Sequence, residues 1–200
     1  LNVPPFIATL AMMEIVYGIG LIVTNATPLG GYVEAYTNVA NKKFLGINYL
    51  IWIAIIVAAI TWFIFNMTRH GKYMYAIGGN PQAAEVAGVP VKATMILIYM
   101  KAAAMYGLAG FMLGAKAGGA SVNLGYGYEM EAIAACTIGG VSVTGGRGKV
   151  SSAIIGVAVF ELLKAALQYL GVDANAQYIA IGIVIFVAIS LDIRKYVAKK

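Results

Sequence analysis

Apolar residues along the chain gather into six long runs, separated by stretches rich in glycine, polar and charged residues. The hydrocarbon core of a bilayer requires about 20 mainly apolar residues per helix, so runs of nearly this length predict membrane-spanning helices. The fourth run is the shortest and contains Gly139-Gly140, which predicts a broken or incomplete crossing. The runs cover residues 6–23, 48–65, 93–115, 131–143, 150–170 and 176–193.

The composition of the chain supports the same class of protein. Apolar residues make up 61% of the chain and charged residues 11%, whereas soluble domains carry about 25% charged residues. Neither a soluble globule nor a disordered chain has this balance. The single Cys and single His exclude a disulfide framework and leave little for a metal site or a catalytic triad. We therefore predict an all-α, polytopic helix bundle in a membrane, with no metal, cofactor or enzyme activity.

Lysine and arginine residues between the runs predict the orientation of the chain, because cytoplasmic loops near spans carry an excess of them. If all six runs cross and the C-terminus is inside, nine fall on the cytoplasmic side and three outside, so both ends are predicted to be cytoplasmic. The net charge of +6 is scattered rather than gathered on one face, so we expect no nucleic-acid partner. The inside set is Arg69, Lys72, Lys92, Arg147, Lys149, Arg194, Lys195, Lys199 and Lys200, and the outside set is Lys42, Lys43 and Lys116.

Four charged residues lie inside the predicted spans, namely Glu14, Lys101, Glu161 and Lys164. A lone charge at the centre of a membrane helix costs about 2.5 to 3.5 kcal/mol on insertion scales, so each needs a partner or water. Glu161 and Lys164 are three residues apart and can pair on one helix face. Glu14 and Lys101 fall at comparable depths and are expected to pair with each other. Structural pairing is the favoured interpretation, and an ion or proton relay is the alternative.

Small residues recur every four positions at Gly110, Gly114 and Gly118 and again at Gly148, Ser152 and Gly156. This spacing predicts close packing between helices in lipid, with the lining of a transport path as the alternative. Residues 144–149 read Thr-Gly-Gly-Arg-Gly-Lys and invite comparison with a phosphate-binding loop. That motif requires Gly at position 143 and Ser or Thr at position 150, and this chain has valine at both. We therefore interpret the segment as a glycine-rich turn with two cytoplasmic positive charges and no nucleotide site.

The segment between the second and third runs carries signals for one short helix. Asn80 is a good N-cap, Pro81 suits the first helical position, and Gly88 suits the residue just past the end. They predict a helix of about seven residues, entered through a flexible Gly78-Gly79 pair. So short a helix is unstable without a docking surface, which favours a plug for a partner's socket over a surface turn packed on its own bundle. His70, earlier in this loop, is expected to be solvated.

Residues 78–89, which read Gly-Gly-Asn-Pro-Gln-Ala-Ala-Glu-Val-Ala-Gly-Val, resemble a cytoplasmic loop of the permease subunits of bacterial sugar ABC importers of the ribose, galactose and methyl-galactoside type. A second stretch, from Leu124-Gly125 through Tyr128-Glu129 and residues 131–135 to the glycines between positions 139 and 156, is similar to the same family. The similarity runs from about Pro4 to the C-terminus. Members of this family have further spans upstream, so we expect an N-terminal portion to be missing before Leu1.

The resemblance implies that residues 1–200 form the C-terminal part of one transmembrane permease domain in the bacterial inner membrane. It implies a short cytoplasmic coupling helix at about residues 80–88 and a sugar translocation path. The implied partners are a cytoplasmic ATP-binding subunit that hydrolyses ATP, a periplasmic sugar-binding protein, membrane lipid and a second permease copy, giving a homodimer. The ATPase-coupling residues implied are Gly79, Asn80, Pro81, Ala83, Ala84, Glu85 and Gly88.

Three positions depart from the family pattern. The family often has Asp where Glu131 stands, Asn where Lys164 stands, and Trp where Ala176 stands. The alternative function is a secondary, ion-coupled transporter that uses Glu14, Glu161 or Lys101. Ion sites of such transporters lie at broken helices near the midplane, for which Gly139-Gly140 is the candidate.

Overall fold

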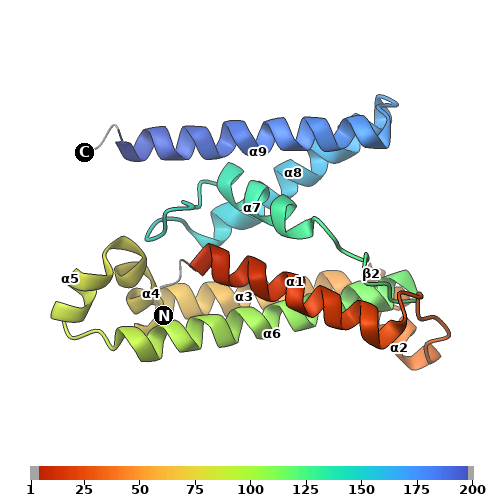
Figure 1. Cartoon of the computed structure of the whole chain (residues 1–200), viewed down its shortest axis with the longest axis horizontal. Helices are drawn as coiled ribbons and strands as arrows, with labels where there is room; N and C mark the ends of the chain where they lie inside the picture. Colours follow the sequence, from red (N-terminus) through yellow and green to blue (C-terminus); the bar gives the residue numbers. More distant parts are fainter. Residues whose placement is uncertain (1–4, 198–200) are drawn as a thin grey trace. The chain divides into compact units, whose positions relative to one another are not determined.

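Long helices coincide with the apolar runs of the sequence in the computed structural model, which describes residues 5–197 (Figure 1). Five of the described helices are long and apolar enough to cross a membrane. The predicted class, a polytopic helical membrane protein, is therefore confirmed. These helices are α1 (Pro5–Thr24), α3 (Tyr49–Met67), α6 (Val91–Ala117), α8 (Val150–Tyr169) and α9 (Ala174–Val197).

The fourth apolar run does not form a full span. Its helix, α7 (Tyr128–Ile138), has 11 residues, which makes it about 16 Å long, against a hydrocarbon core of about 30 Å. It ends at Ile138 with Gly139 as its C-cap, and Gly140 follows with a φ of +83°. The described chain therefore holds five full-length spans instead of six, and the incomplete crossing expected at Gly139-Gly140 is present. The cytoplasmic placement of both ends stays a prediction, and Lys199 and Lys200 lie outside the described residues.

The connection between the first two spans contains regular structure. Helix α2 (Glu34–Asn41) is followed by strands β1 (Lys43–Phe44) and β2 (Ile47–Asn48), which pair antiparallel with Lys43 opposite Asn48. The two residues of the turn, Leu45 and Gly46, both have positive φ. This conformation suits a two-residue hairpin because its twist matches that of the strands. The connection is thus a helix and a hairpin.

The chain divides into two compact units. The first unit comprises residues 5–52 and 105–126, and the second comprises residues 53–104 and 127–197. In the first unit, the hydroxyl of Tyr17 in α1 donates to Asn123 Oδ1 over 3.0 Å. The hydroxyl of Tyr36 in α2 donates to the carbonyl of Phe111 in α6 over 2.7 Å. Leu29 and Ala120 also form an isolated antiparallel bridge. These contacts join the end of α6 and the residues that follow it to α1, α2 and the segment between them.

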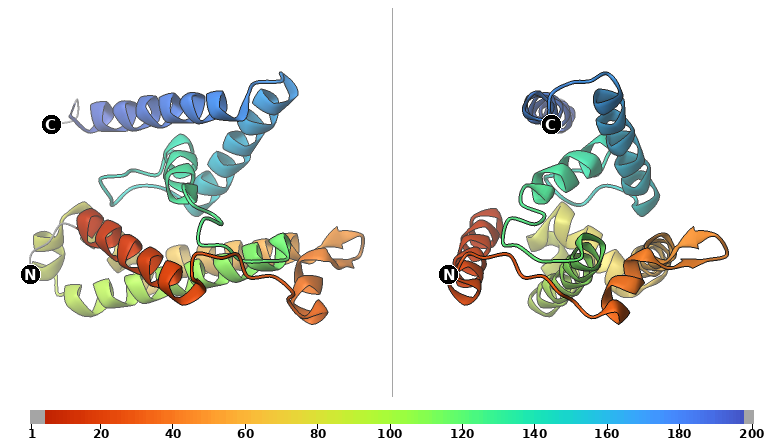
Figure 2. Two further views of the ribbon diagram at one scale, coloured as in Figure 1. Left: turned by 45° about the vertical axis from the view of Figure 1, so that its right-hand side comes forward. Right: turned by 90° about the vertical axis from the view of Figure 1, so that its right-hand side faces the viewer.

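In the second unit, the short helix α7 packs against both α8 and α9 (Figure 2). Their buried core consists of Ala134 and Ala135 from α7, Phe160 from α8 and Ile181 from α9. At Gly156 a Cβ atom would collide with the carbonyl oxygen of Ala135, so α8 approaches the backbone of α7 directly. The close helix packing predicted from Gly148, Ser152 and Gly156 is confirmed at Gly156, whereas a Cβ atom added at Gly110 or Gly118 would have no neighbour within 4 Å.

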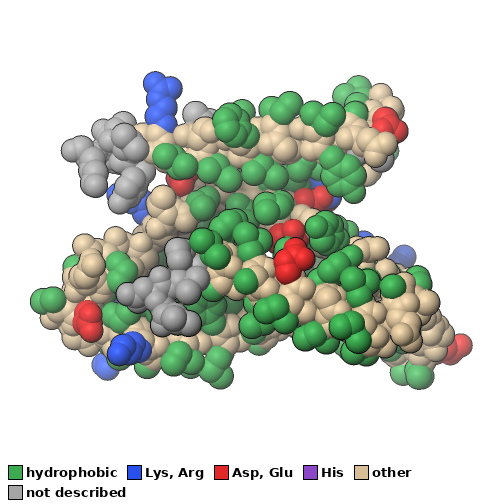
Figure 3. Space-filling view, in the orientation of Figure 1, with side chains coloured by type: hydrophobic (Ala, Val, Ile, Leu, Met, Phe, Trp, Pro, Cys, Tyr) green, Lys and Arg blue, Asp and Glu red, His purple; other side chains and the backbone are tan. Residues whose placement is uncertain are grey.

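Most large apolar side chains on the spans are exposed in the chain taken by itself. In α1, Ile22 and Val23 are 78% and 75% exposed, and Phe186 in α9 is 72% exposed. Figure 3 shows hydrophobic side chains along α1 and along α9, with charged side chains few on this face. Apolar surface of this extent marks a binding or membrane surface in a protein. Because the same helices satisfy their backbone groups internally, they suit a lipid environment.

Two further helices follow α3 in the second unit, α4 (Arg69–Gly79) and α5 (Pro81–Val86). The side-chain oxygen of Thr68 accepts a hydrogen bond from the backbone N–H of Gly71 over 3.1 Å and so caps α4. Gly71 is required there, since a Cβ atom would collide with the carbonyl oxygens of Ile64 and Phe65 at the end of α3. Helix α4 therefore packs tightly against the last turn of α3.

Candidate functional site

The short helix predicted after Asn80 is present as α5. Asn80 Oδ1 accepts the backbone N–H of Ala83 over 3.0 Å, and Pro81 occupies the first turn. The helix has six residues, one fewer than predicted, because Ala87 already leaves the helical conformation with a ψ of 6°. The N-cap and the first-position proline act as the sequence indicated.

The end of α5 is a complete Schellman motif. Gly88 has a φ of +82° and donates its N–H to Glu85, while Val89 donates its N–H to Ala84, both over 3.0 Å. In this motif a glycine in the left-handed conformation lets two following N–H groups satisfy the last carbonyls of a helix. Both ends of α5 are thus fixed by local hydrogen bonds, which explains how a six-residue helix keeps a defined length.

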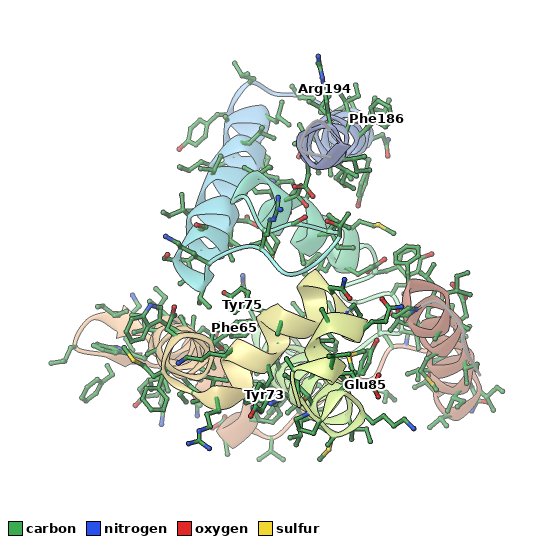
Figure 4. The ribbon with its side chains drawn as sticks, turned by 90° about the vertical axis from the view of Figure 1, so that its left-hand side faces the viewer. Phe65, Tyr73, Tyr75, Glu85, Phe186 and Arg194 are labelled. Carbon is green, nitrogen blue, oxygen red and sulfur yellow. The ribbon has the colours of Figure 1, made fainter. Side chains whose placement is uncertain are left out.

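The side chains of α5 divide into an inner and an outer set. Ala84 is 4% exposed, whereas Val86 is 91% exposed, and Ala83 and Glu85 are also exposed. Glu85 is labelled in Figure 4. Ala84 is among the residues that the resemblance implies for coupling to the ATPase. Because it is buried within the chain itself, it can position α5 but cannot offer its side chain to another protein.

The α4–α5 junction packs on the loop that joins α7 to α8 (residues 139–149, the α7–α8 loop). A Cβ atom on Gly78 would lie 2.5 Å from the backbone nitrogen of Gly146, and one on Gly146 would lie 2.6 Å from that of Gly79. The two backbones therefore touch without intervening side chains. The interpretation of Gly78-Gly79 as a flexible entry was wrong, since both glycines belong to α4 and Gly78 is held against the loop.

The α7–α8 loop is also tied to α9. Asp192 Oδ2 accepts the hydroxyl of Ser142 over 2.9 Å and the backbone N–H of Val143 over 3.2 Å. Within the loop, the N–H of Ser142 donates to the carbonyl of Arg147 over 3.1 Å. Sequence reasoning missed Asp192. The signal was a single acidic residue at the end of the last apolar run, close to several basic residues.

The charged residues of α8 form ion pairs, and one partner differs from the prediction. Lys164 Nζ lies 2.7 Å from Glu131 Oε2 in α7 and 4.0 Å from Glu161 Oε1. The predicted Glu161 contact is thus present at the limit of an ion pair, and the short contact is to Glu131. Side chains of Lys164 and Glu131 are 22% and 21% exposed, whereas that of Glu161 is 62% exposed. The Lys164–Glu131 pair therefore links α7 to α8, and its two members depart from the resembled family together.

Glu14 and Lys101 lie in α1 and α6, within the first and the second unit respectively. Their pairing stays a prediction. Within residues 5–197, no group of three His, Cys, Asp or Glu side chains lies close enough together to hold a metal ion.

His70 is not the solvated loop residue that the sequence suggested. It lies in the first turn of α4 and is half-buried. Its Nε2 atom is buried and finds no hydrogen-bond partner in the part of the chain that the structure describes. Burial, followed by the positive charge of Lys101, lowers the pKa of His70 below its usual value of 6.5. The prediction failed because residues 69–79 form α4 and not a loop, and Thr68, the N-cap of α4, is the signal in the sequence for this helix.

Comparisons with known proteins identify the family of the chain. Residues 1–189 match a family described as the permease component of the branched-chain amino acid transport system. The galactose/methyl galactoside import permease proteins of Haemophilus influenzae and Escherichia coli are 41% and 40% identical to the chain, over 100% of it and 62% of each relative. The ribose import permease protein of Bacillus subtilis is 37% identical over 96% of the chain and 60% of the relative.

The chain spans about three fifths of the length of these curated relatives. No solved structure matches it significantly. The family match covers most of the chain, and the relatives match nearly all of it. The chain, a multi-pass protein of the bacterial inner membrane, thus belongs to the permease family described for the branched-chain amino acid transport system.

Proposed function

We propose that this chain is part of the permease subunit of an ATP-driven sugar importer, in which α5 is the coupling helix for a cytoplasmic ATP-binding subunit. The observation that carries the proposal is the construction at α5. A helix of six residues has a cap at each end and an exposed outer side, and the residues that lead into it, Gly78 and Gly79, lie against the α7–α8 loop. Caps fix such a helix in length, and its instability in isolation favours a docked position.

The outer side of α5 offers two side chains to a partner. Val86 is almost fully exposed, and the carboxylate of Glu85 stands beside it in the sequence. An apolar side chain with a neighbouring charge suits a groove with an apolar floor and a basic rim. We assign contact with the ATP-binding subunit to Asn80, Pro81, Ala83, Glu85 and Val86, with Gly79, Ala84 and Gly88 setting the position of the helix.

Movement of α5 has a direct route into the membrane. Because Gly78 and Gly146 touch through their backbones, a displacement of the α4–α5 junction pushes on the α7–α8 loop with no flexible side chain between them. Asp192 belongs to α9 and accepts a hydrogen bond from the loop, so the displacement also reaches α9. The loop joins α7 to α8, so these two helices are displaced with it. Packed elements of this kind change between discrete arrangements instead of deforming continuously. ATP binding and hydrolysis in the partner would favour one arrangement through differential affinity.

The relatives supply the substrate class of the proposal. Their names describe import of galactose, methyl galactoside and ribose, so we assign a sugar to this permease, although the family description names branched-chain amino acids. The remaining partners that we propose are a periplasmic sugar-binding protein and a second copy of the permease. In this proposal, residues 1–200 are the C-terminal part of one transmembrane domain.

Transport by the full-length permease reconstituted with its ATP-binding subunit and sugar-binding protein tests the proposal. We expect proteoliposomes loaded with ATP to accumulate labelled galactose or ribose without an ion gradient and in the presence of an ionophore. Unlabelled leucine should not compete. Uptake that requires a proton or sodium gradient and ignores ATP would instead support the ion-coupled alternative. Competition by leucine would move the substrate class to amino acids.

A further inference from the structure

A cavity in the second unit lies beside the α7–α8 loop. Its volume is about 330 Å³, which is at the lower end of the range for small-molecule sites. Half of the lining residues belong to the α7–α8 loop, and the others come from α3, α4, α7 and the first turn of α8. They are mainly apolar and include Phe65, Met74, Cys136, Val141 and Ala153.

The cavity lies where two membrane spans end. Phe65 is in the last turn of α3, which ends at Met67, and Ala153 is in the first turn of α8. The ring of Phe65 meets that of Tyr75 edge-on, with centroids 5.8 Å apart, so two aromatic residues stand side by side at this level (Figure 4). Aromatic residues are enriched at the boundary between hydrocarbon and water. The cavity is therefore at the depth of lipid headgroups, with its apolar wall toward the spans.

The charged residues that line the cavity are basic, and Ser142 of the same wall donates a hydrogen bond to Asp192 in α9. Arg147 and Lys149 both line it, and no acidic residue is among the described residues that do so. Both cations are exposed, and they stand on the side of the chain that the distribution of Lys and Arg marks as cytoplasmic. The walls present mainly apolar surface beside these two cations. An occupant with an anionic end and a long apolar part matches them.

We propose that this cavity binds an anionic glycerophospholipid from the cytoplasmic leaflet. The lipid phosphate lies between Arg147 and Lys149, and one acyl chain lies against Phe65, Met74 and Ala153. Anionic lipids are concentrated in this leaflet, and basic pockets between membrane helices at this level bind their headgroups. In this proposal the cavity is a lipid site and does not bind the transported sugar. Tyr75 and Gly148 also line the cavity, and the hydroxyl of Tyr75 donates a hydrogen bond to the carbonyl of Gly148. The lipid therefore also fills the space beside this hydrogen bond.

Lipid binding to the full-length permease in detergent tests the site by native mass spectrometry with phosphatidylglycerol and phosphatidylcholine. We expect phosphatidylglycerol to be retained at least tenfold better. The Lys149→Gln and Arg147→Gln/Lys149→Gln variants should lose most of this preference, and Ala153→Trp should reduce retention by filling the apolar wall. Lys72→Gln/Lys92→Gln is the matched control because it removes two cations of the same side that do not line the cavity; it should keep the preference.

Maleimide labelling of Cys136, which lines the cavity, gives a second readout. Phosphatidylglycerol should slow the labelling several-fold, whereas phosphatidylcholine and inorganic phosphate should not. If inorganic phosphate protected Cys136 from labelling equally well, the occupant of the cavity would be a free anion and not a lipid. Equal retention of both lipids, or unchanged preference in Lys149→Gln, would overturn the proposal. So would labelling that is blocked in lipid-free protein, since a segment of the full-length chain would then occupy the cavity.

Discussion

The hydroxyl of Tyr75 in α4 donates a hydrogen bond of 2.8 Å to the backbone carbonyl of Gly148, at the end of the α7–α8 loop. This is a long-range contact, because 73 residues separate donor and acceptor in the sequence. It lies on the same elements as the contact between Gly78 and Gly146. The helix that leads into α5 is therefore joined to the α7–α8 loop by one hydrogen bond and one close approach of backbones.

Replacement of Tyr75 by Phe removes the hydrogen bond and keeps the ring that packs on Phe65. A hydrogen bond of this kind contributes about 0.5 to 1.5 kcal/mol to stability. We expect a small fall in melting temperature and a lower ratio of sugar transported to ATP hydrolysed in the reconstituted importer. Thermal unfolding and coupled uptake measure the two effects. An unchanged ratio at a lowered melting temperature would restrict the contact to stability.

The neighbouring glycines Gly78 and Gly79 provide a matched pair of substitutions. A Cβ atom at Gly78 would meet the backbone of Gly146, whereas at Gly79 nothing lies within 4 Å. Alanine is favoured over glycine in helices by about 1 kcal/mol, so Gly79→Ala should be neutral or stabilising. Gly78→Ala should reduce coupled uptake strongly, because backbone on both sides has to move. Similar behaviour of the two variants would contradict the close contact.

The Lys164–Glu131 pair can be measured with a double-mutant cycle. Lys164→Leu leaves the carboxylate of Glu131 without its partner, and the Lys164→Leu/Glu131→Leu variant removes both charges. We expect the single variant to be less stable than the double variant, with a coupling energy of about 0.5 to 3 kcal/mol. The same cycle with Glu161 should give a smaller value, because that contact is 4.0 Å long and exposed. Equal coupling in both cycles would contradict this ranking.

His70 should make stability depend on pH. Its lowered pKa means that the unfolded chain binds a proton more readily than the folded chain as pH falls below about 6.5. The contribution of neutral His70 to the free energy of unfolding is therefore fully present above that pH. It is lost as the pH falls toward the pKa of His70 in the folded chain. We expect His70→Phe to unfold at a less pH-dependent temperature between pH 7.5 and 5.5. An identical decline in both proteins would show that His70 does not contribute.

The outer side of α5 can be tested without disturbing its packing. Val86→Asp changes an exposed side chain and should leave melting temperature unchanged while reducing co-purification with the ATP-binding subunit. Gly88→Val is the structural comparison, since a β-branched residue is strained at a φ of +82° and should lower stability as well. Normal co-purification of Val86→Asp would remove this side of α5 from the proposed interface.

Local signals predicted some parts of the site well. Apolar runs located five spans, and Asn80, Pro81 and Gly88 located α5 to within one residue. These features depend on neighbours in the sequence, namely the length needed to cross a bilayer and the capping of helix ends. Glycines at Gly145 and Gly146 were identified as a turn for the same reason, and both have positive φ.

Contacts between distant segments were not predictable from the same patterns. A glycine pair permits flexibility or a close approach of backbones, and only the position of Gly146 beside Gly78 decides between them. Lys164 has acidic residues both nearby and 33 positions away, and the shorter contact goes to the distant Glu131. Helix α4 was missed because its 11 residues carry too few apolar positions to stand out from a loop.

The length of α6 has a consequence for the membrane around the chain. With 27 residues it is about 40 Å long, while the 19 residues of α3 give about 28 Å. A hydrocarbon core of about 30 Å matches α3 and is too thin for an upright α6. Lys92 and Lys116 stand near the two ends of α6, and such cations extend toward the headgroups. Hydrophobic mismatch is therefore built into the chain: α6 must tilt or project, and bilayer thickness becomes a variable that acts on this helix first.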